Sequence, residues 1–438
     1  MLRLRPSRLA AACAIAALAA CAGSPSDGSA GHGTAGSFSI AVLPDTQNMI
    51  DYKHQKAAGF PIDASELYLG EMRWIAEHAA LRGGDVVFAA AVGDVWQHQS
   101  LPIDAEHAAR GFVAIANPWL AEFQPTPQTV AVELPMARRG YAVLADTGLP
   151  FGVAPGNHDY DAMWSDSHYP PVSDAKKIDG TPKTLGMLHV GGLDNFRSVF
   201  GAAGAFFAGK PWYVASYQGG TSSAQTFTAG GYTFLHIALQ MSPNETVIQW
   251  AASVIGQHPG LPTIVTTHDY LNAKGERKAN PIIELAAVDF THSTAEQLWH
   301  ELIDRNDQIF LVLCGHHHGV ATRTDRNAAG HDVLQLLADY QDRGQAALDA
   351  GAPLVRGQPA PIGDAWLRVL TFDTAAATPS LRVRTYSPHY RAFADELADY
   401  AKWYKAHETP DLDDAAFVHK DAFTVDLHDF RARFGTSH

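Results

Sequence analysis

The chain has 438 residues, of which 46% are hydrophobic and 18% charged. It can therefore bury a sizeable core in one large domain or two ordinary ones, and wholesale disorder is excluded. The formal net charge of −14 repels polyanions, which argues against a nucleic-acid partner, and three cysteines are too few for a disulfide framework.

The first twenty residues have the pattern of a targeting segment. Three arginines lie within the first eight residues, and the apolar stretch 9–20 is too short to span a bilayer. Residues 18–21 spell Leu-Ala-Ala-Cys, which resembles a bacterial lipobox. We therefore expect residues 1–20 to be a lipoprotein signal peptide and Cys21 to carry the lipid. The alternative is an ordinary secretory signal cut near Ala22.

A lipid on Cys21 would make the protein an extracytoplasmic, membrane-anchored bacterial lipoprotein, periplasmic or on the cell surface. Residues 21–37 are rich in Gly, Ser and Ala, and this composition is typical of a flexible tether. The rest, 38–438, is predicted to be one domain, with an insertion at about 98–150 and a C-terminal extension at about 391–438. The oligomeric state is left open.

Five apolar, often β-branched runs are predicted as strands, and polar residues follow each of them. In chain order the runs are 38–43, 86–92, 151–155, 263–267 and 309–314. They lead into Asp45-Thr46-Gln47, Gly93-Asp94, Gly156-Asn157-His158-Asp159, His268, and Gly315-His316-His317-His318. Open α/β sheets bind ligands at the carboxyl ends of their strands, and mixed Asp, Asn and His ligands suit divalent cations.

The remaining elements follow from periodicity and capping signals. Helices are expected at 65–81 and 104–116, after N-cap Ser242, after a capping box that begins at Ser293, and at 394–405. Further strands are expected at 232–239, 333–337, 366–372, 381–386 and 423–427, and part of the second sheet should be antiparallel. The segment 161–212 reads as loop-rich; its Trp164, His168 and Tyr169 would either wall a substrate pocket or cover the core.

The ordered polar motifs resemble those of the calcineurin-like metallophosphoesterases over roughly residues 38–320. The spelling Leu-Pro-Asp-Thr-Gln at 43–47 also looks like a secreted bacterial branch of that family. The resemblance implies an α/β fold of the α+β sandwich type, with two mixed β-sheets flanked by helices.

The resemblance also implies two divalent metal ions, Mn, Fe, Zn or Mg, that share Asp94 as a bridging ligand. The other implied ligands are Asp45, Gln47 and His318 for the first ion, and Asn157, His268 and His316 for the second. A hydroxide that bridges the ions would attack a small-molecule phosphate ester. His158 would act as general acid at the leaving group. Asp159 would either orient His158 or cap the turn.

Two positions depart from the family pattern. Gln47 stands where the family usually has His, and its neutral oxygen should weaken the first metal site or favour Mn, Fe or Mg over Zn. Trp96 stands where purple acid phosphatases carry a Tyr ligand, which disfavours that subtype. Besides a general phosphoesterase, the alternatives are a nucleotide- or phospholipid-directed phosphodiesterase and a degenerate, non-catalytic metal-binding surface protein.

Three further residues near these motifs have simpler interpretations. His98 could approach a substrate after the Asp94 turn, and His317 should face solvent or support the ligands. Cys314, inside an apolar run, is expected to be a buried core thiol.

Overall fold

The computed structural model describes residues 36–179 and 181–435. The predicted signal peptide at 1–20, Cys21 and most of the tether lie outside the described residues. Within those residues, none of the helices combines the length and the apolar character needed to cross a membrane.

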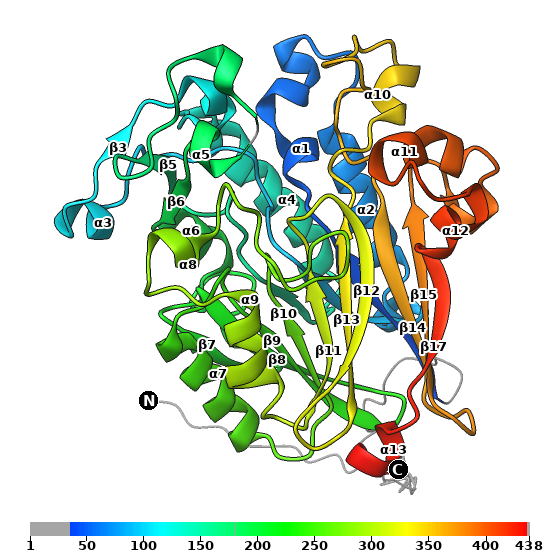
Figure 1. Ribbon diagram of the computed structural model, residues 1–438. Coiled ribbons are helices and arrows are strands. Elements are labelled where there is room, and N and C mark those ends of the chain that lie inside the picture. The colour runs from blue at the N-terminus through cyan, green and yellow to red at the C-terminus, as the bar shows by residue number, and fades with distance from the viewer. Residues whose placement is uncertain (1–35, 180, 436–438) are drawn as a thin grey trace, which may run out of the picture. The chain divides into compact units, whose positions relative to one another are not determined.

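The first sheet has a parallel half and an antiparallel half that meet at β1 (Figure 1). The parallel strands are β1 (Ser37–Leu43), β2 (Val86–Ala91) and β4 (Phe151–Val153). The antiparallel strands are β14 (Leu367–Asp373), β15 (Ser380–Ser387), β16 (Ala392–Phe393) and β17 (Ala422–Asp426).

The second sheet is also mixed, with four central parallel strands and antiparallel strands on both sides. The parallel strands, in spatial order, are β13 (Asp332–Asp339), β11 (Ile309–Cys314), β10 (Thr263–Thr266) and β9 (Tyr232–Ala238). The antiparallel strands are β12 (Gly319–Arg326) beside β13, and β8 (Ser222–Ala229) and β7 (Tyr213–Tyr217) beyond β9.

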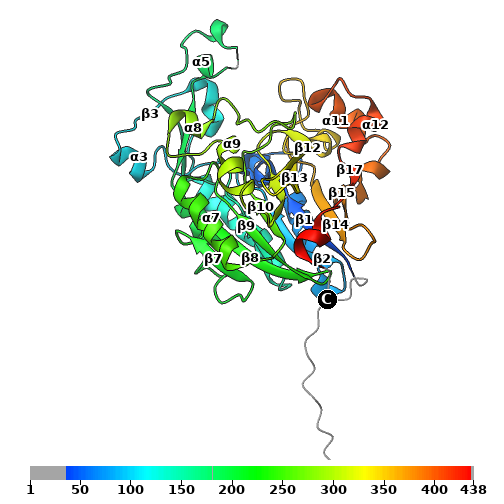
Figure 2. The same ribbon diagram turned by 60° about the horizontal axis from the view of Figure 1, so that its bottom comes forward.

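A small third sheet shares no strand with the other two. Its three antiparallel strands are β3 (Ala114–Ile115), β5 (Ala162–Asp166) and β6 (Leu188–Gly191). In Figure 2 the label of β3 stands with those of α3 (Ala105–Ala109) and α5 (Pro182–Leu185), on the opposite side from α11 (Tyr400–Glu408) and α12 (Asp414–His419).

Alternation along the strands explains why the two large sheets pack face to face. In β1, Phe38, Ile40 and Val42 join an apolar cluster with Phe234 of β9 and Phe310 of β11. Successive side chains of a strand point to opposite faces, so the intervening residues of β1 face the other way, toward helices. The result is a β-sandwich whose core lies between the sheets.

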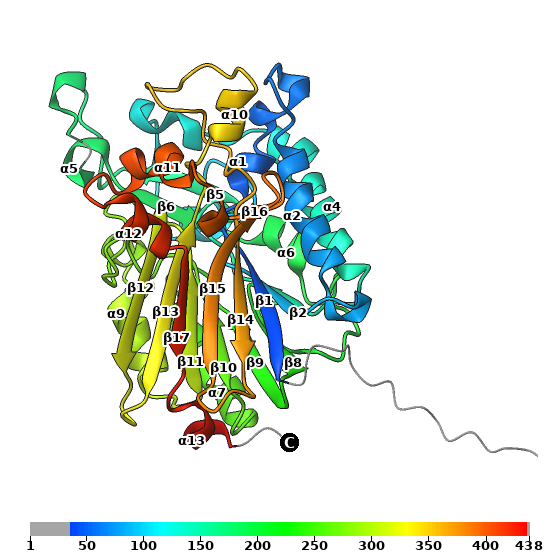
Figure 3. The ribbon, with the colours of Figure 1, turned by 90° about the vertical axis from the view of Figure 1, so that its right-hand side faces the viewer.

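Helices cover the outer faces of the sandwich. α2 (Ser65–Glu77) and α4 (Leu134–Ala145) lie side by side on the first sheet (Figure 3), and the hydroxyl of Tyr68 donates to the carbonyl of Ala137 at 3.1 Å. α7 (Glu245–Gln257) and α9 (Ala295–Leu298) bury their apolar residues against the second sheet. The predicted class, two mixed sheets flanked by helices, is therefore confirmed.

The remaining helices are short. They are α1 (Gln47–Ile50), α6 (Asp194–Phe200), α8 (Leu285–Val288), α10 (Gln345–Asp349) and α13 (Phe430–Phe434). The predicted helix 65–81 ends earlier than expected, at Glu77, and the predicted helix 394–405 begins later, at Tyr400.

Cys314 is buried as predicted, and burial raises the pKa of its thiol far above the usual value.

Two local predictions about elements were wrong. The helix expected at 104–116 is only α3, because Gly111, at φ +89°, turns the chain into β3. The loop-rich segment 161–212 contains β5, β6 and α6, and in β5 the side chains of Trp164 and its neighbours are buried.

The capping residues were also misassigned. Asn244, not Ser242, caps α7: its side-chain oxygen accepts from the backbone N–H of Val247 at 3.0 Å. The second capping box is formed by Thr294 and Gln297, one residue later than the pair expected from Ser293.

The strands expected at 366–372 and 381–386 were placed in the wrong sheet. They are β14 and β15, which belong to the first sheet and are not the antiparallel part of the second.

Candidate metal centre

Parallel strands of both large sheets end at one edge, near α1 in Figure 1. Polar residues lie at the carboxyl ends of six of these strands, as is usual for ligand sites of α/β sheets. They are Asp45 after β1, Asp94 after β2, Asn157 after β4, His268 after β10, His316 after β11 and Asp339 at the end of β13.

Asp94 and His268 meet across the two sheets. The Nε2 atom of His268 lies 3.1 Å from Oδ2 of Asp94, while its Nδ1 bonds the carbonyl of Val92 at 2.9 Å. Nδ1 therefore carries a proton, and Nε2 is directed at the carboxylate. His316 completes a buried group of three whose potential ligand atoms lie within 4.8 Å of one another. Imidazole nitrogen and carboxylate oxygen at these separations are a donor set for a divalent cation.

Three more of the predicted ligands surround this pair. Oδ1 of Asn157 is 3.1 Å from Nε2 of His268, and Oδ1 of Asp45 is 3.8 Å from the same nitrogen. Nε2 of Gln47 is 3.3 Å from Oδ2 of Asp94. The structure thus gathers every predicted ligand except His318 into one buried set of contacts.

Glycines allow the strand-end turns to approach the carboxylates. A Cβ atom on Gly156 would lie 2.2 Å from Oδ1 of Asp94, and one on Gly315 would lie 2.2 Å from Oδ2 of Asp45. Asp94 and His316 themselves have φ angles of 51° and 71°, a left-handed conformation that non-glycine residues rarely adopt. Strained backbone of this kind persists where its surroundings fix it, often at functional sites.

His318 lies at the margin of the group. Its ring is about half exposed, and its Nδ1 pairs with the carboxylate of Asp342. Metal-binding histidines commonly donate one ring N–H to a carboxylate and use the other nitrogen for the metal. For His317 we expected either a solvent-facing or a supporting position. Its Nε2 lies 3.1 Å from Oδ1 of Asp269, so the side chain contacts a neighbouring carboxylate.

The end of β13 also contributes to the centre, although none of its residues was predicted as a site residue. This strand ends at Asp339, whose carboxylate accepts from the backbone N–H of Gln341 at 2.9 Å. The side chain of Gln341 in turn contacts that of Gln47. Burial raises the pKa of Asp339 to about 6, although His318 opposes the shift. The available signal was Asp339-Tyr340-Gln341-Asp342, a polar run directly after an apolar strand, as at the other sites.

His158 and Asp159 lie on the turn that follows β4. The backbone N–H of His158 donates to Oδ1 of Asp94 at 2.9 Å, and its Nε2 lies 4.0 Å from Oδ2 of the same carboxylate. The carboxylate of Asp159 accepts from the backbone N–H groups of Gly156 at 2.8 Å and Val95 at 2.9 Å. Of the two roles left open for Asp159, these bonds favour capping the turn.

The buried carboxylates of the centre are stabilised by positive charge beside them. Burial and then the carboxylate of Asp339 raise the pKa of Asp45 well above its usual value. Burial by itself would lower the pKa of His268, but Asp94 and Asp45 raise it to about 10. Burial likewise opposes ionisation of Asp94, yet His268 and His158 hold its pKa well below the usual range. Clustered carboxylates therefore attract positive charge to this point.

Several buried polar atoms of the centre have no hydrogen-bond partner. They include Oδ2 of Asp45, Oε1 of Gln47 and Nε2 of His316. Buried polar groups are nearly always satisfied, so a cluster of orphaned oxygen and nitrogen atoms suggests a bound ion. The donor types, their burial and their orphaned atoms all fit a divalent cation site.

A second buried group, Asp51, His98 and Glu133, also has metal-ligand chemistry. Here Nδ1 of His98 bonds Oε1 of Glu133 at 2.7 Å, and its Nε2 lies 3.0 Å from Nζ of Lys53. The ammonium of Lys53 already supplies a positive charge, so this group needs no metal. His98 is only 2% exposed, which argues against direct contact with a substrate.

Comparison with known proteins gives weak matches. No family model matches the chain. The uncharacterized protein YvnB of Bacillus subtilis (strain 168) is 26% identical over 261 residues, which cover 58% of this chain and 16% of YvnB. This chain therefore spans a small part of that relative's length. Among solved structures, GAP50, the anchor in the inner membrane complex of Plasmodium, aligns over 82% of this chain and 86% of its own, with 9% identity and a TM-score of 0.34. Neither match assigns a function.

Proposed function

We propose that the protein hydrolyses phosphate esters with the help of two divalent cations held at the shared edge of the two sheets. The observation that carries this proposal is the buried contact of Asp94 with His268, surrounded by Asp45, Asn157 and His316. Phosphoryl transfer in water needs charge stabilisation above all, and a cluster of this kind is suited to provide it through metal ions.

We assign the ligands to the two ions as the resemblance to the metallophosphoesterases implies, with Asp94 shared by both. Asp45, Gln47 and His318 would hold one ion, and Asn157, His268 and His316 would hold the other. When bound, such ions lower the pKa of water toward about 7 and offset the negative charge of a phosphoryl group. Gln47 would contribute through its orphaned Oε1 atom, while its Nε2 stays turned to Asp94 and Gln341.

His158 would handle a proton at Nε2. Its Nδ1 lies against the carbonyl of Gln97, which accepts a hydrogen bond and keeps Nδ1 protonated. In the imidazolium form, the second N–H is then at Nε2, the atom that faces Oδ2 of Asp94. A positioned acid there can protonate a departing alkoxide. Asp159 would hold the turn that presents His158 and Asn157.

The test is reconstitution of metal-free protein with Mn, Fe, Zn or Mg, followed by assays with 4-nitrophenyl phosphate and bis(4-nitrophenyl) phosphate. We expect turnover only after metal uptake, and its loss in His268→Ala. A matched variant, Asp51→Asn, changes a buried carboxylate outside the centre and should keep its activity. Protein that binds two ions and hydrolyses neither ester would instead be the non-catalytic metal-binding protein considered as an alternative.

A further inference from the structure

A pocket of about 220 Å³ lies between the segment 342–361 and α11, a helix of the predicted C-terminal extension. We call it the α10–α11 pocket. Its apolar wall is formed by Val355, Pro359, Pro361, Trp403 and Tyr404. Both α10 and α11 lie at the same end of the molecule as α1 (Figure 1 and Figure 3). Mostly apolar pockets with a few polar groups are characteristic of small-molecule sites.

One lining residue of the α10–α11 pocket contacts a proposed metal ligand. Asp342 lines the pocket, and its Oδ2 atom pairs with Nδ1 of His318, a ligand implied for the first ion. The preceding residue, Gln341, contacts the side chain of Gln47. A carboxylate has a second oxygen that can accept a hydrogen bond from a bound molecule. The pocket therefore adjoins the metal centre on the side of the first ion.

Both walls of the pocket are fixed by hydrogen bonds within the protein. On one side, Val355 and Gln358 exchange two backbone hydrogen bonds, of 2.8 and 3.0 Å. The two residues between them have φ angles of 51° and 83°, as in a tight hairpin turn. On the other side, the hydroxyl of Tyr404 donates to Oδ2 of Asp364 at 2.7 Å. The pocket is thus formed in the protein alone, which lowers the cost of ordering it around a ligand.

Apolar surface of the pocket is left in contact with water. Val355 is 49% exposed although it lines the wall, and the adjacent Leu354 is 55% exposed. Trp403 is half-buried, and its ring centroid lies 4.9 Å from that of Tyr390. Covering such surface is favourable, and an aromatic ligand gains more than its area against an aromatic wall. These features favour an aromatic ring as the occupant.

The polar groups of the pocket lie at its mouth. Its ionisable lining residues, Asp342, Arg356 and His407, are all exposed. The side chains of Gln345 and Gln358 add amides. One carboxylate and one guanidinium offset each other, so the mouth has little net charge. A charged group against the apolar wall would lose hydration without finding a partner, so the interior favours an uncharged ring with its polar substituent at the mouth.

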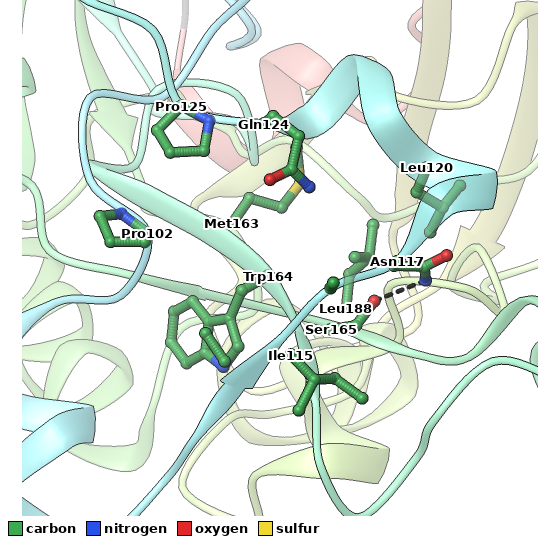
Figure 4. Close-up of a pocket in the computed structure, with 12 residues that line it drawn as sticks. Pro102, Ile115, Asn117, Leu120, Gln124, Pro125, Met163, Trp164, Ser165 and Leu188 are labelled. Atoms are coloured by element: carbon green, nitrogen blue, oxygen red, sulfur yellow. Dashed lines mark hydrogen bonds between the residues drawn. The ribbon is translucent and has the colours of Figure 1, made fainter.

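A second cavity, of about 230 Å³, lies beside the small third sheet (Figure 4). There Nδ2 of Asn117 donates to Oγ of Ser165 at 2.6 Å and to the carbonyl of Leu185 at 2.8 Å. These bonds use both hydrogens of the amide, so Asn117 has no further hydrogen to donate to a ligand. The α10–α11 pocket is the better candidate because it keeps a carboxylate and two amides at its mouth.

We propose that the α10–α11 pocket binds an uncharged aromatic ring that carries a hydroxyl or amino group. The ring would lie between Val355 and Trp403, and its polar group would donate to Asp342. A cavity of roughly 150 Å³ suffices to hold benzene, so one substituted ring fits the volume. Such a ring comes either from a free aromatic compound or from a phosphate ester held at the metal centre, and the experiment below separates these sources. The pocket itself does not depend on the proposed function.

The test uses phenol as the probe and needs no turnover. Saturation-transfer NMR on the metal-free protein should detect phenol and should not detect glycerol, which offers hydroxyl groups without a ring. Val355→Asp places a carboxylate on the apolar wall and should weaken phenol binding about tenfold or more, because the bound ring would strip that charge of water. Leu354→Asp makes the same change at the adjacent exposed residue, outside the lining, and should bind phenol as the wild type does.

A second variant, Trp403→Leu, keeps the wall apolar but removes its aromatic face. It should weaken phenol binding about two- to tenfold, the range expected for one aromatic pair. Equal phenol affinity in the wild type and in folded Val355→Asp and Trp403→Leu would overturn the proposal. An equal loss in Leu354→Asp would also overturn it, since the effect would then come from the segment and not from the pocket.

The source of the ring is separated with phenylphosphonate, which cannot be hydrolysed as an ester. Displacement of phenol by phenylphosphonate and not by methylphosphonate, seen after metal loading and not before, would assign the ring to a ligand of the metal centre. Phenol that stays bound in both states would assign the pocket to a free aromatic compound. Neither result requires ester hydrolysis, so the pocket can stand in a protein for which the proposed function fails.

Discussion

Nε2 of His268, which follows a strand of the second sheet, lies 3.1 Å from Oδ2 of Asp94, which follows a strand of the first. The contact joins the carboxyl edges of the two sheets at one buried point. The turns that hold the two residues leave little room for either to move. The core packed between the sheets fixes the distance between the sheets.

The first prediction separates proton transfer from metal binding. His158→Ala should retain both metal ions and the fold, because the side chain of His158 is not assigned as a ligand. A positioned acid contributes about 10²- to 10⁴-fold, so turnover should fall within that range. The loss should be largest for alkyl esters and smallest for nitrophenyl esters, whose leaving groups need little protonation. Equal losses for both ester classes, at confirmed metal content, would remove His158 as the leaving-group acid.

The second prediction concerns Gln47. Its side chain is fully buried and turned toward Asp94 and Gln341, with Oε1 lacking a partner. Gln47→His should raise affinity at the first site and shift preference toward Zn, because imidazole is the softer ligand. Gln47→Ala should mainly lower affinity there. Metal titrations followed by calorimetry measure both effects, and unchanged titrations in both variants would place Gln47 outside the ligand set.

The third prediction tests how His318 is oriented. Asp342→Asn removes the carboxylate that pairs with Nδ1 of His318. Loss of such a partner typically costs about 10- to 100-fold in metal affinity, so the first site should weaken by that amount while the second is unchanged. Asp349→Asn, an exposed change on the neighbouring helix α10, is the matched control. If the two variants bind metal alike, His318 does not depend on Asp342 as a ligand would.

The fourth prediction concerns stability. Glu71 of α2 is fully buried, and neither of its carboxylate oxygens has a partner. Burial raises the pKa of Glu71 well above its ordinary value. The folded state therefore keeps a proton that the unfolded state loses once the pH exceeds the ordinary pKa of 4.5. Stability from this residue must fall as the pH rises from there through the folded pKa.

Glu71→Met should accordingly stabilise the protein at pH 7 by roughly 1–3 kcal/mol, the usual cost of a buried unsatisfied polar group. Urea unfolding at several pH values between 5 and 8 should show the gain growing with pH. Glu77→Met, at an exposed position of the same helix, should change little. A gain for Glu71→Met that stays constant across this range would mean that Glu71 is ionised in the folded protein.

Much of the candidate site could be predicted because most of the proposed ligands follow an apolar strand run. Asp94, Asn157, His268 and His316 were each identified in this way, and the sheet topology then brings the strand ends together. Asp339 follows the same rule, but β13 could be recognised as a parallel neighbour of β11 only from the three-dimensional strand order.

Tertiary context decided what local patterns could not. Ser242 and Asn244 are both residue types that commonly cap helices. Asn244 caps α7, whereas Ser242, at φ +46°, belongs to the preceding turn. The small sheet was missed because β3 is only two residues long and its pairing partner β5 is distant in the chain. Strands that short carry no readable period.

The central claim, that Asp94 serves two cations, is tested most directly by metal stoichiometry. Metal-free wild type, Asp94→Asn and Asp51→Asn would each be dialysed against Mn or Zn and analysed for bound metal per chain. We predict two ions in the wild type and in Asp51→Asn, and fewer than one in Asp94→Asn, because an amide can neither bridge two ions nor offset their repulsion. Two ions at full occupancy in Asp94→Asn would contradict the account.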